Sequence, residues 1–98
     1  MAQFIAIVHR DHDGHAPDDF TPELLELEAE GARTLYTADV VRSYWSRKDV
    51  PGAVLLIEAA DEAAARAAVD TLPLRKRGML ALDMLVPLMP YRGFAPRG

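Results

Sequence analysis

The sequence predicts one α+β domain in which two helices cover one face of a four-stranded antiparallel sheet. Four short segments are apolar, rich in β-branched residues and bounded by turn-forming residues, which is typical of strands. Two longer segments have the 3.6-residue period of amphipathic helices. The chain has 98 residues, of which 50% are hydrophobic, enough for one domain with a real core.

The first half of the chain begins with a predicted strand, Gln3–His9, followed by a polar loop, Arg10–Phe20. A helix is expected next, over Thr21–Ala38. Thr21 is a favourable N-cap, and Pro22 suits the first helical position, where its missing N–H costs nothing. Val40–Trp45 is the second predicted strand.

The second half repeats this alternation after a turn at residues 47–52. Ala53–Ala59 is apolar on both faces, so we expect it to be a central strand. Asp61 caps a second predicted helix, Glu62–Leu72, which stops before a proline. A basic connection, Pro73–Gly78, leads to the last predicted strand, Met79–Leu88, and residues 89–98 form a C-terminal tail.

The predicted order β-α-β-β-α-β is that of the ferredoxin-like split βαβ arrangement. The strands carry more apolar side chains than two helices can cover, so part of them is expected on the second sheet face. These side chains are Ile5, Ile7, Val54, Leu56, Leu80 and Leu82. An apolar sheet face must be covered, and the simplest cover is a second copy. We therefore expect a homodimer packed sheet to sheet, or a higher homo-oligomer.

Composition excludes several classes of function. The net charge of −4 argues against nucleic acid as a partner. The chain has no cysteine, so thiol catalysis and cysteine-ligated metals are excluded. No apolar run is long enough to cross a membrane, and the N-terminal segment lacks the pattern of a secretory signal. The expected location is the cytoplasm.

Glu28 is the strongest candidate for a functional residue, because helical periodicity places it near the centre of the apolar face of the first helix, one turn after Leu24. A carboxylate placed against a core must find a partner, meet a cavity or take up a proton. One interpretation is structural, with the side chain reaching the helix edge or pairing with an arginine. The other is a pocket acid or base with a raised pKa.

The second strand carries three further candidates. Strand alternation predicts Arg42 and Tyr44 on one face and Trp45 on the other. Arg42 either neutralises Glu28 or binds a substrate carboxylate. Tyr44 is a candidate proton donor. Trp45 is either a core or interface residue, or a flat apolar pocket wall.

The loop HRDHDGH contains His9, His12 and His15. Three interpretations remain open: a solvated polar loop, a pocket lid with His12 as a catalytic group, or a metal site built from imidazoles and carboxylates. We expect no bound metal, because the loop is flexible and no cysteine supports it.

Several segments resemble muconolactone isomerase and its wider family. These are VRSYW at residues 41–45, the acid-ended third strand, Asp61 with its alanine-rich helix, Leu-Pro-Leu at residues 72–74, and Val-Pro-Leu at residues 86–88. The resemblance covers the chain from about Leu24 onward. It implies a dimeric α/β barrel and lactone isomerisation without metal or cofactor, with Glu28, Arg42 and Trp45 at positions matching the family pattern.

Two features depart from that pattern. The connection between Leu74 and Leu88 is several residues longer. The acid usually found three residues before the final Pro-Leu is replaced by Met84, with Asp83 one place earlier. A shift of one residue turns a strand side chain to the other face, so either a bulge restores its direction or Asp83 serves another purpose.

With no nucleophile triad and no cofactor motif, the predicted chemistry is proton transfer next to a carbonyl, as in a small cofactor-free isomerase of aromatic-compound metabolism acting on a lactone or related cyclic carbonyl compound. Alternatives are a cofactor-free monooxygenase, a cyclase of polyketide-like substrates, and a non-catalytic module that binds a small molecule or supports assembly.

Overall fold

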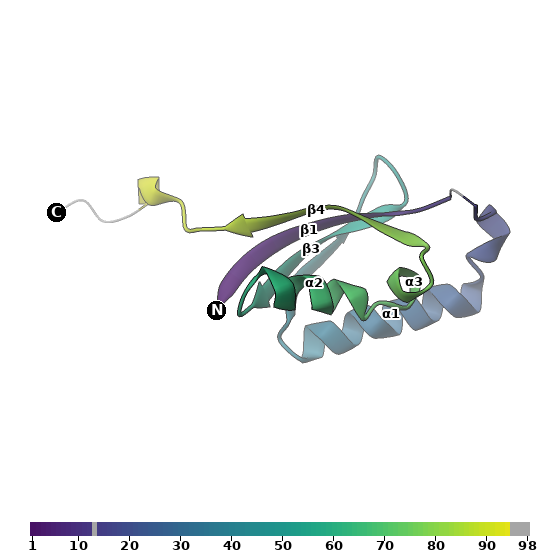
Figure 1. Ribbon diagram of the computed structural model, residues 1–98, viewed down its shortest axis with the longest axis horizontal. Helices are drawn as coiled ribbons and strands as arrows, with labels where there is room; N and C mark the ends of the chain where they lie inside the picture. Colours follow the sequence, from purple (N-terminus) through teal and green to yellow (C-terminus); the bar gives the residue numbers. More distant parts are fainter. Residues whose placement is uncertain (13, 95–98) are drawn as a thin grey trace.

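A computed structural model of the chain describes residues 1–12 and 14–94 (Figure 1). It has an α+β fold, with a four-stranded antiparallel sheet and three helices beneath one face. The strands are β1 (Ala2–Arg10), β2 (Val41–Ser46), β3 (Gly52–Ala59) and β4 (Leu80–Leu88). The helices are α1 (Pro22–Thr37), α2 (Glu62–Asp70) and α3 (Pro73–Lys76), with 3-10 turns η1 (Pro17–Asp19) and η2 (Arg92–Phe94).

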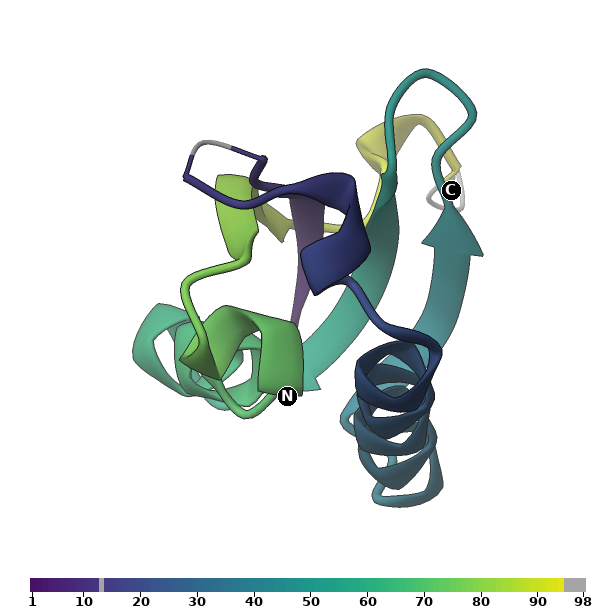
Figure 2. The same cartoon turned by 90° about the vertical axis from the view of Figure 1, so that its right-hand side faces the viewer.

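The strand order across the sheet is β2-β3-β1-β4, so β1 and β3 are central. The prediction that Ala53–Ala59 lies inside the sheet is therefore confirmed. Figure 2 shows how the helices are arranged below the strands, with α1 on the side of β2 and α2 together with α3 on the other side. α1 contacts both β2 and α3.

The core lies between the sheet and the helices. Every second residue of β3 is buried there, including Leu55 and Ile57. The six apolar strand residues that two helices were not expected to cover fully lie on both faces of the sheet. Leu80 is buried in the core and Leu82 packs against it, whereas the alternation of β1 and β3 turns the other four outward. These four are Ile5, Ile7, Val54 and Leu56, all half-buried.

Helix α1 begins as expected, because the Thr21 side chain accepts a hydrogen bond from the amide of Leu24. The buried stripe of α1 is narrow. Leu24 and Leu35 are buried, but Leu27 and Tyr36 expose 53% and 59% of their surface. α1 therefore contacts the sheet along only part of its apolar face.

The segment predicted as a basic connection contains a helix, so that prediction was wrong. α2 ends at Asp70, and Pro73 begins α3 after Leu72 as its N-cap. Proline interrupts a helix from within but fits the first helical position. Pro73 therefore separates two helices and starts the second one.

Both edge strands contain an irregularity. The register of β2 against β3 shifts between Val41 and Ser43, so Arg42 departs from simple alternation. The register of β4 against β1 moves from Met84 to Leu82, leaving Asp83 as the extra residue of a bulge. The bulge restores the inward direction of Leu82 and Leu80.

The segment after β4 leads away from the sheet and helices (Figure 1). Its apolar side chains are largely exposed, with Met89 at 75%, Tyr91 at 70% and Phe94 at 86%. None of the helices in residues 1–12 and 14–94 is both long and apolar enough to span a membrane.

Candidate functional site

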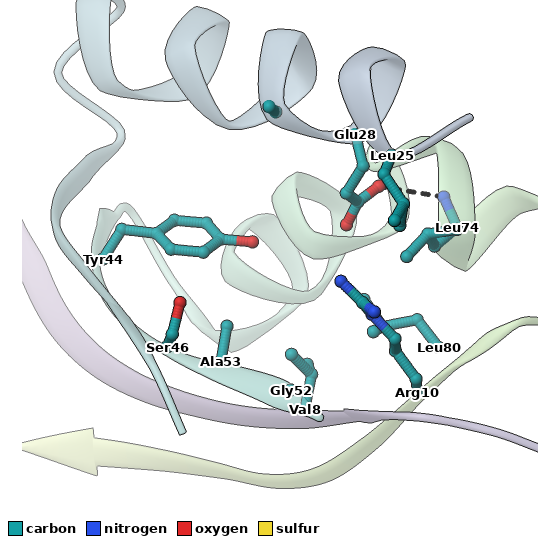
Figure 3. Close-up of a pocket in the computed structure, with 11 residues that line it drawn as sticks. Val8, Arg10, Leu25, Glu28, Tyr44, Ser46, Gly52, Ala53, Leu74 and Leu80 are labelled. Atoms are coloured by element: carbon teal, nitrogen blue, oxygen red, sulfur yellow. Dashed lines mark hydrogen bonds between the residues drawn. The ribbon is translucent and has the colours of Figure 1, made fainter. Parts of the chain in front are cut away.

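A pocket of about 220 Å³ lies between α1 and the inner face of the sheet. Its walls are mostly apolar, and four polar side chains enter it from three different elements (Figure 3). The apolar lining is formed by Val8, Leu25, Ala29, Ala53, Leu74 and Leu80, together with Gly52. The polar lining is Arg10 from β1, Glu28 from α1, and Tyr44 and Ser46 from β2.

Glu28 is held from the side by the start of α3. Its Oε1 accepts a hydrogen bond of 2.9 Å from the backbone amide of Leu74 (Figure 3). Gly31, one turn further along α1, permits this approach: a Cβ there would lie 3.0 Å from Cδ of Pro73. The contact fixes the carboxylate and leaves Oε2 without a hydrogen-bond partner in the part of the chain that the structure describes.

Burial raises the pKa of the Glu28 carboxyl above its ordinary value of 4.5, because the ionised form loses water in the apolar pocket. The Leu74 hydrogen bond and the positive charge of Arg10 lower the pKa and offset part of this effect. Glu28 is half-buried. The carboxyl is therefore a better proton acceptor than an exposed glutamate would be.

Tyr44 faces the carboxylate from β2, with its hydroxyl directed into the pocket (Figure 3). The residue exposes 38% of its surface, but its hydroxyl end is the buried part. Burial, and next the negative charge of Glu28, raise the pKa of Tyr44 to about 12. Tyr44 therefore remains protonated near neutral pH, so its hydroxyl has a proton to donate.

Arg10 and Ser46 are the polar pocket residues that sequence reasoning missed. Arg10 was missed because it stands at the boundary between the first strand and the polar loop. Its guanidinium carbon lies 5.7 Å from the centre of the Phe20 ring, and the group points toward Glu28 across the pocket (Figure 3). No ion pair joins Arg10 to an acid within residues 1–12 and 14–94. The alternation of β1 could have placed its side chain inward beside Val8, had the strand been extended by one residue.

Arg42 lies apart from Glu28. It pairs with Asp39 at 3.3 Å and with Glu58 at 3.9 Å, beside the bulge in β2. The expectation that Arg42 and Tyr44 share a face assumed a regular strand, and the register shift removes that assumption. Tyr44 therefore enters the pocket without Arg42.

Trp45 lies on the opposite side of β2 from the Glu28 pocket, as its alternation with Tyr44 predicted. It is 52% exposed and is paired with Val54 in the sheet register. A second hollow of about 350 Å³ runs past Trp45, Tyr36 and Arg42. Trp45 thus belongs to the outer surface of the sheet.

The two histidines of the first loop do not enter the pocket. The ring of His12 packs against Phe20 with the ring centres 5.0 Å apart. Nδ1 of His15 is buried and has no hydrogen-bond partner among the described residues. Within those residues no three histidine, aspartate or glutamate side chains gather as metal ligands; Asp13 lies outside them.

No protein-family model matches the sequence, and none of the curated proteins matches it.

Proposed function

We propose that the pocket is a cofactor-free proton-transfer site and that the protein is a small isomerase acting on a lactone or a related cyclic carbonyl compound. One observation carries the proposal: Glu28, with a raised pKa, opens onto a mostly apolar pocket opposite two hydrogen-bond donors. This arrangement is what abstraction of a proton next to a carbonyl requires. The resemblance to the muconolactone isomerase family supports the same chemistry.

The proposed reaction moves one proton and two electron pairs. Oε2 of Glu28 removes a proton from the carbon next to the carbonyl, and the electron pair of the broken C–H bond forms an enolate. The protonated carboxyl then returns the proton to another carbon of the conjugated system, and the carbonyl re-forms. The double bond migrates, and no oxidant or cofactor is consumed.

Tyr44 and Arg10 have complementary parts in this scheme. The Tyr44 hydroxyl stays protonated, so it can donate to the enolate oxygen as charge develops there. Arg10 supplies positive charge on the same side, and its planar donors suit either an enolate or a carboxylate. The pocket volume of about 220 Å³ is below the roughly 300–1,000 Å³ of common ligand pockets, which favours a monocyclic substrate.

The proposal includes a dimeric α/β barrel of the ferredoxin-like type. The chain contains two βαβ units, one from β1 to β2 and one from β3 to β4. The first strands of both units, β1 and β3, lie side by side in the centre of the sheet, which supports a split βαβ arrangement. The outer sheet face carries Ile5, Ile7, Val54 and Leu56, and a second copy packed on it would remove them from water.

The test uses unsaturated five-membered lactones in D₂O, with and without a carboxymethyl group. Proton NMR reports both the loss of C–H signals by exchange and the migration of the double bond. We expect exchange with the native protein and a fall of roughly 10²-fold or more in Glu28→Gln. The matched control is Glu58→Gln, which removes a carboxylate from the outer sheet face. Equal rates for Glu28→Gln and the native protein would rule out Glu28 as the proton carrier.

A binding module is the second candidate, and the Leu74 hydrogen bond favours it, because that bond holds Glu28 in place as a binding group would be held. This alternative would be supported if a lactone carrying a carboxylate binds tightly but none of its C–H protons exchanges with deuterium. In the monooxygenase alternative Trp45 or a histidine would assist the reaction with oxygen, but neither Trp45 nor His9, His12 or His15 lines the pocket.

A further inference from the structure

On the outer face of the sheet, opposite the pocket, a histidine, an arginine and an aspartate side chain form a cluster. Nδ1 of His9 lies 2.7 Å and 2.9 Å from the two carboxylate oxygens of Asp83. Nη1 of Arg47 donates to Oδ2 of Asp83 over 3.1 Å. The same Nη1 lies 3.4 Å from the backbone oxygen of Val8. We call His9, Arg47 and Asp83 the rear cluster.

The rear cluster sits on the bulge of β4. Asp83 is the extra residue where the register against β1 shifts, and its carboxylate is hydrogen-bonded to His9, on the same outer face. β3 approaches very closely here: a Cβ on Gly52 would lie 2.3 Å from the oxygen of Val8 and 2.9 Å from Cα of His9. The cluster thus joins β1, β4 and the turn between β2 and β3.

The same strand segments line the pocket from the other side. Val8 and Arg10 flank His9 in β1 and both face the pocket. Arg10 is paired with Leu80, which lies on the far side of the bulge and also lines the pocket. The inward direction of Leu80 depends on the bulge, because without the extra residue it would face outward.

We propose that His9, Asp83 and Arg47 are positioning residues that hold Arg10 and Leu80 in the pocket from the opposite face of the sheet. The His9 hydrogen bond, with help from Arg47, keeps the pKa of Asp83 below its usual value, so the carboxylate remains ionised near neutral pH. Without these contacts the end of β1 is less restrained, and the Arg10 guanidinium can move away from the Glu28 carboxyl. The inference rests on the proposed use of the pocket, since positioning matters only if Arg10 and Glu28 act there.

The test measures the pKa of the Glu28 carboxyl, which is the midpoint of a ¹³C NMR titration of protein labelled at the glutamate side chains. Arg10 lowers the pKa of Glu28 through its charge, so displacement of Arg10 raises it further. We expect Asp83→Asn and His9→Ala each to move the Glu28 midpoint upward, because the charge of Arg10 would act on the carboxyl from farther away. His9→Asn restores the native midpoint, because its amide can donate to Asp83 in place of Nδ1.

Glu58→Gln is the control, since it removes a carboxylate from the same sheet face without touching the rear cluster. An unchanged Glu28 midpoint in folded Asp83→Asn and His9→Ala, or an equal shift in the control, overturns the proposal. A variant that fails to fold is replaced by Arg47→Lys, judged by the same two outcomes. Because the titration needs no substrate, a protein without isomerase activity still gives a clear answer on positioning.

Discussion

Oε1 of Glu28 accepts a hydrogen bond from the backbone amide of Leu74 across 2.9 Å, joining α1 to the first turn of α3. The two residues are 46 positions apart in the chain. A carboxylate that accepts a hydrogen bond from a backbone amide is restrained in orientation but keeps its charge uncompensated. An arginine in the same place would neutralise that charge. Among the described residues, Oε2 of Glu28 has no hydrogen-bond partner, and burial still raises the pKa of the carboxyl.

Glu28→Gln should leave the melting temperature at pH 7 unchanged or higher. The amide oxygen of glutamine can still accept from Leu74, and no charge is buried. Because the folded-state pKa of Glu28 is raised, its contribution to stability is complete below the ordinary value of 4.5 and is lost as the pH rises through the folded value. The melting temperature of the variant should therefore rise relative to that of the native protein between pH 4 and pH 7.

Thermal unfolding followed by circular dichroism at both pH values checks this. A clearly lower melting temperature for Glu28→Gln at pH 7 would indicate a structural carboxylate whose charge is needed. In that case Glu28 acts mainly to hold α3.

Tyr44→Phe tests the proton donor. In the ultraviolet titration of the native protein, one tyrosine should ionise near pH 12, and that step should be absent from the variant. The raised pKa also means that the stability contributed by protonated Tyr44 is complete below pH 10.0 and is lost as the pH rises through about 12. Tyr36→Phe is the matched control, because Tyr36 is exposed. Loss of the late step in the control instead would contradict the placement of Tyr44.

Local patterns predicted the parts of the site that depend on one element. Helical periodicity placed Glu28 against the interior, and the half-buried side chain agrees with it. Its partner could not be predicted, since the donor is a backbone amide that every residue except proline carries. The position of that amide depends on α3, where the sequence predicted only a connection.

Irregular strands account for the remaining errors. Alternation assigned Arg42 to the side of Tyr44, but a register shift lies between Val41 and Ser43. The unusual place of Asp83 did indicate a possible bulge, and the structure has one there. That indication came from the departure from the family pattern. Alternation within the strand does not predict the bulge, because Asp83 is held there by contacts with His9 and Arg47 from other parts of the chain.

Gly31→Ala should destabilise the protein, although alanine is the better helix former by about 1 kcal/mol. The new Cβ would stand 3.0 Å from Cδ of Pro73, whose ring cannot rotate away. Overpacking of this kind costs about 1–3 kcal/mol, which exceeds the gain in helix propensity. Chemical denaturation measures the net effect. A more stable variant would mean that α3 moves aside at little cost, and then the Leu74–Glu28 bond should be tested by NMR.

A purified, tag-free sample that has been extensively dialysed should carry no stoichiometric zinc, iron or nickel. His12 packs on Phe20, and no group of three ligands gathers within the described residues. Elemental analysis by mass spectrometry measures the content. One metal equivalent per chain that disappears in His12→Ala would show that the first loop binds metal.

Leu56→Lys and Leu82→Lys should have opposite effects, because the two leucines lie on opposite faces of the sheet. Leu56 faces outward beside Ile5, whereas Leu82 is paired with the fully buried Val8 and packs against the core. Leu56→Lys should leave the monomer folded and weaken the proposed dimer, because it places a charge on the face that a second copy would cover. Leu82→Lys should instead destabilise the protomer, since a lysine ammonium in the core loses its water without gaining a partner.

Size-exclusion chromatography with light scattering gives the assembly, and thermal unfolding gives the stability of each variant. The expected pair of results is a folded Leu56→Lys of lower mass and a Leu82→Lys with a much lower melting temperature. A native protein that is monomeric at micromolar concentration would contradict the dimeric barrel directly. If Leu56→Lys remains as large as the native protein, the outer sheet face is not the interface, and the exposed segment after β4 becomes the next surface to examine.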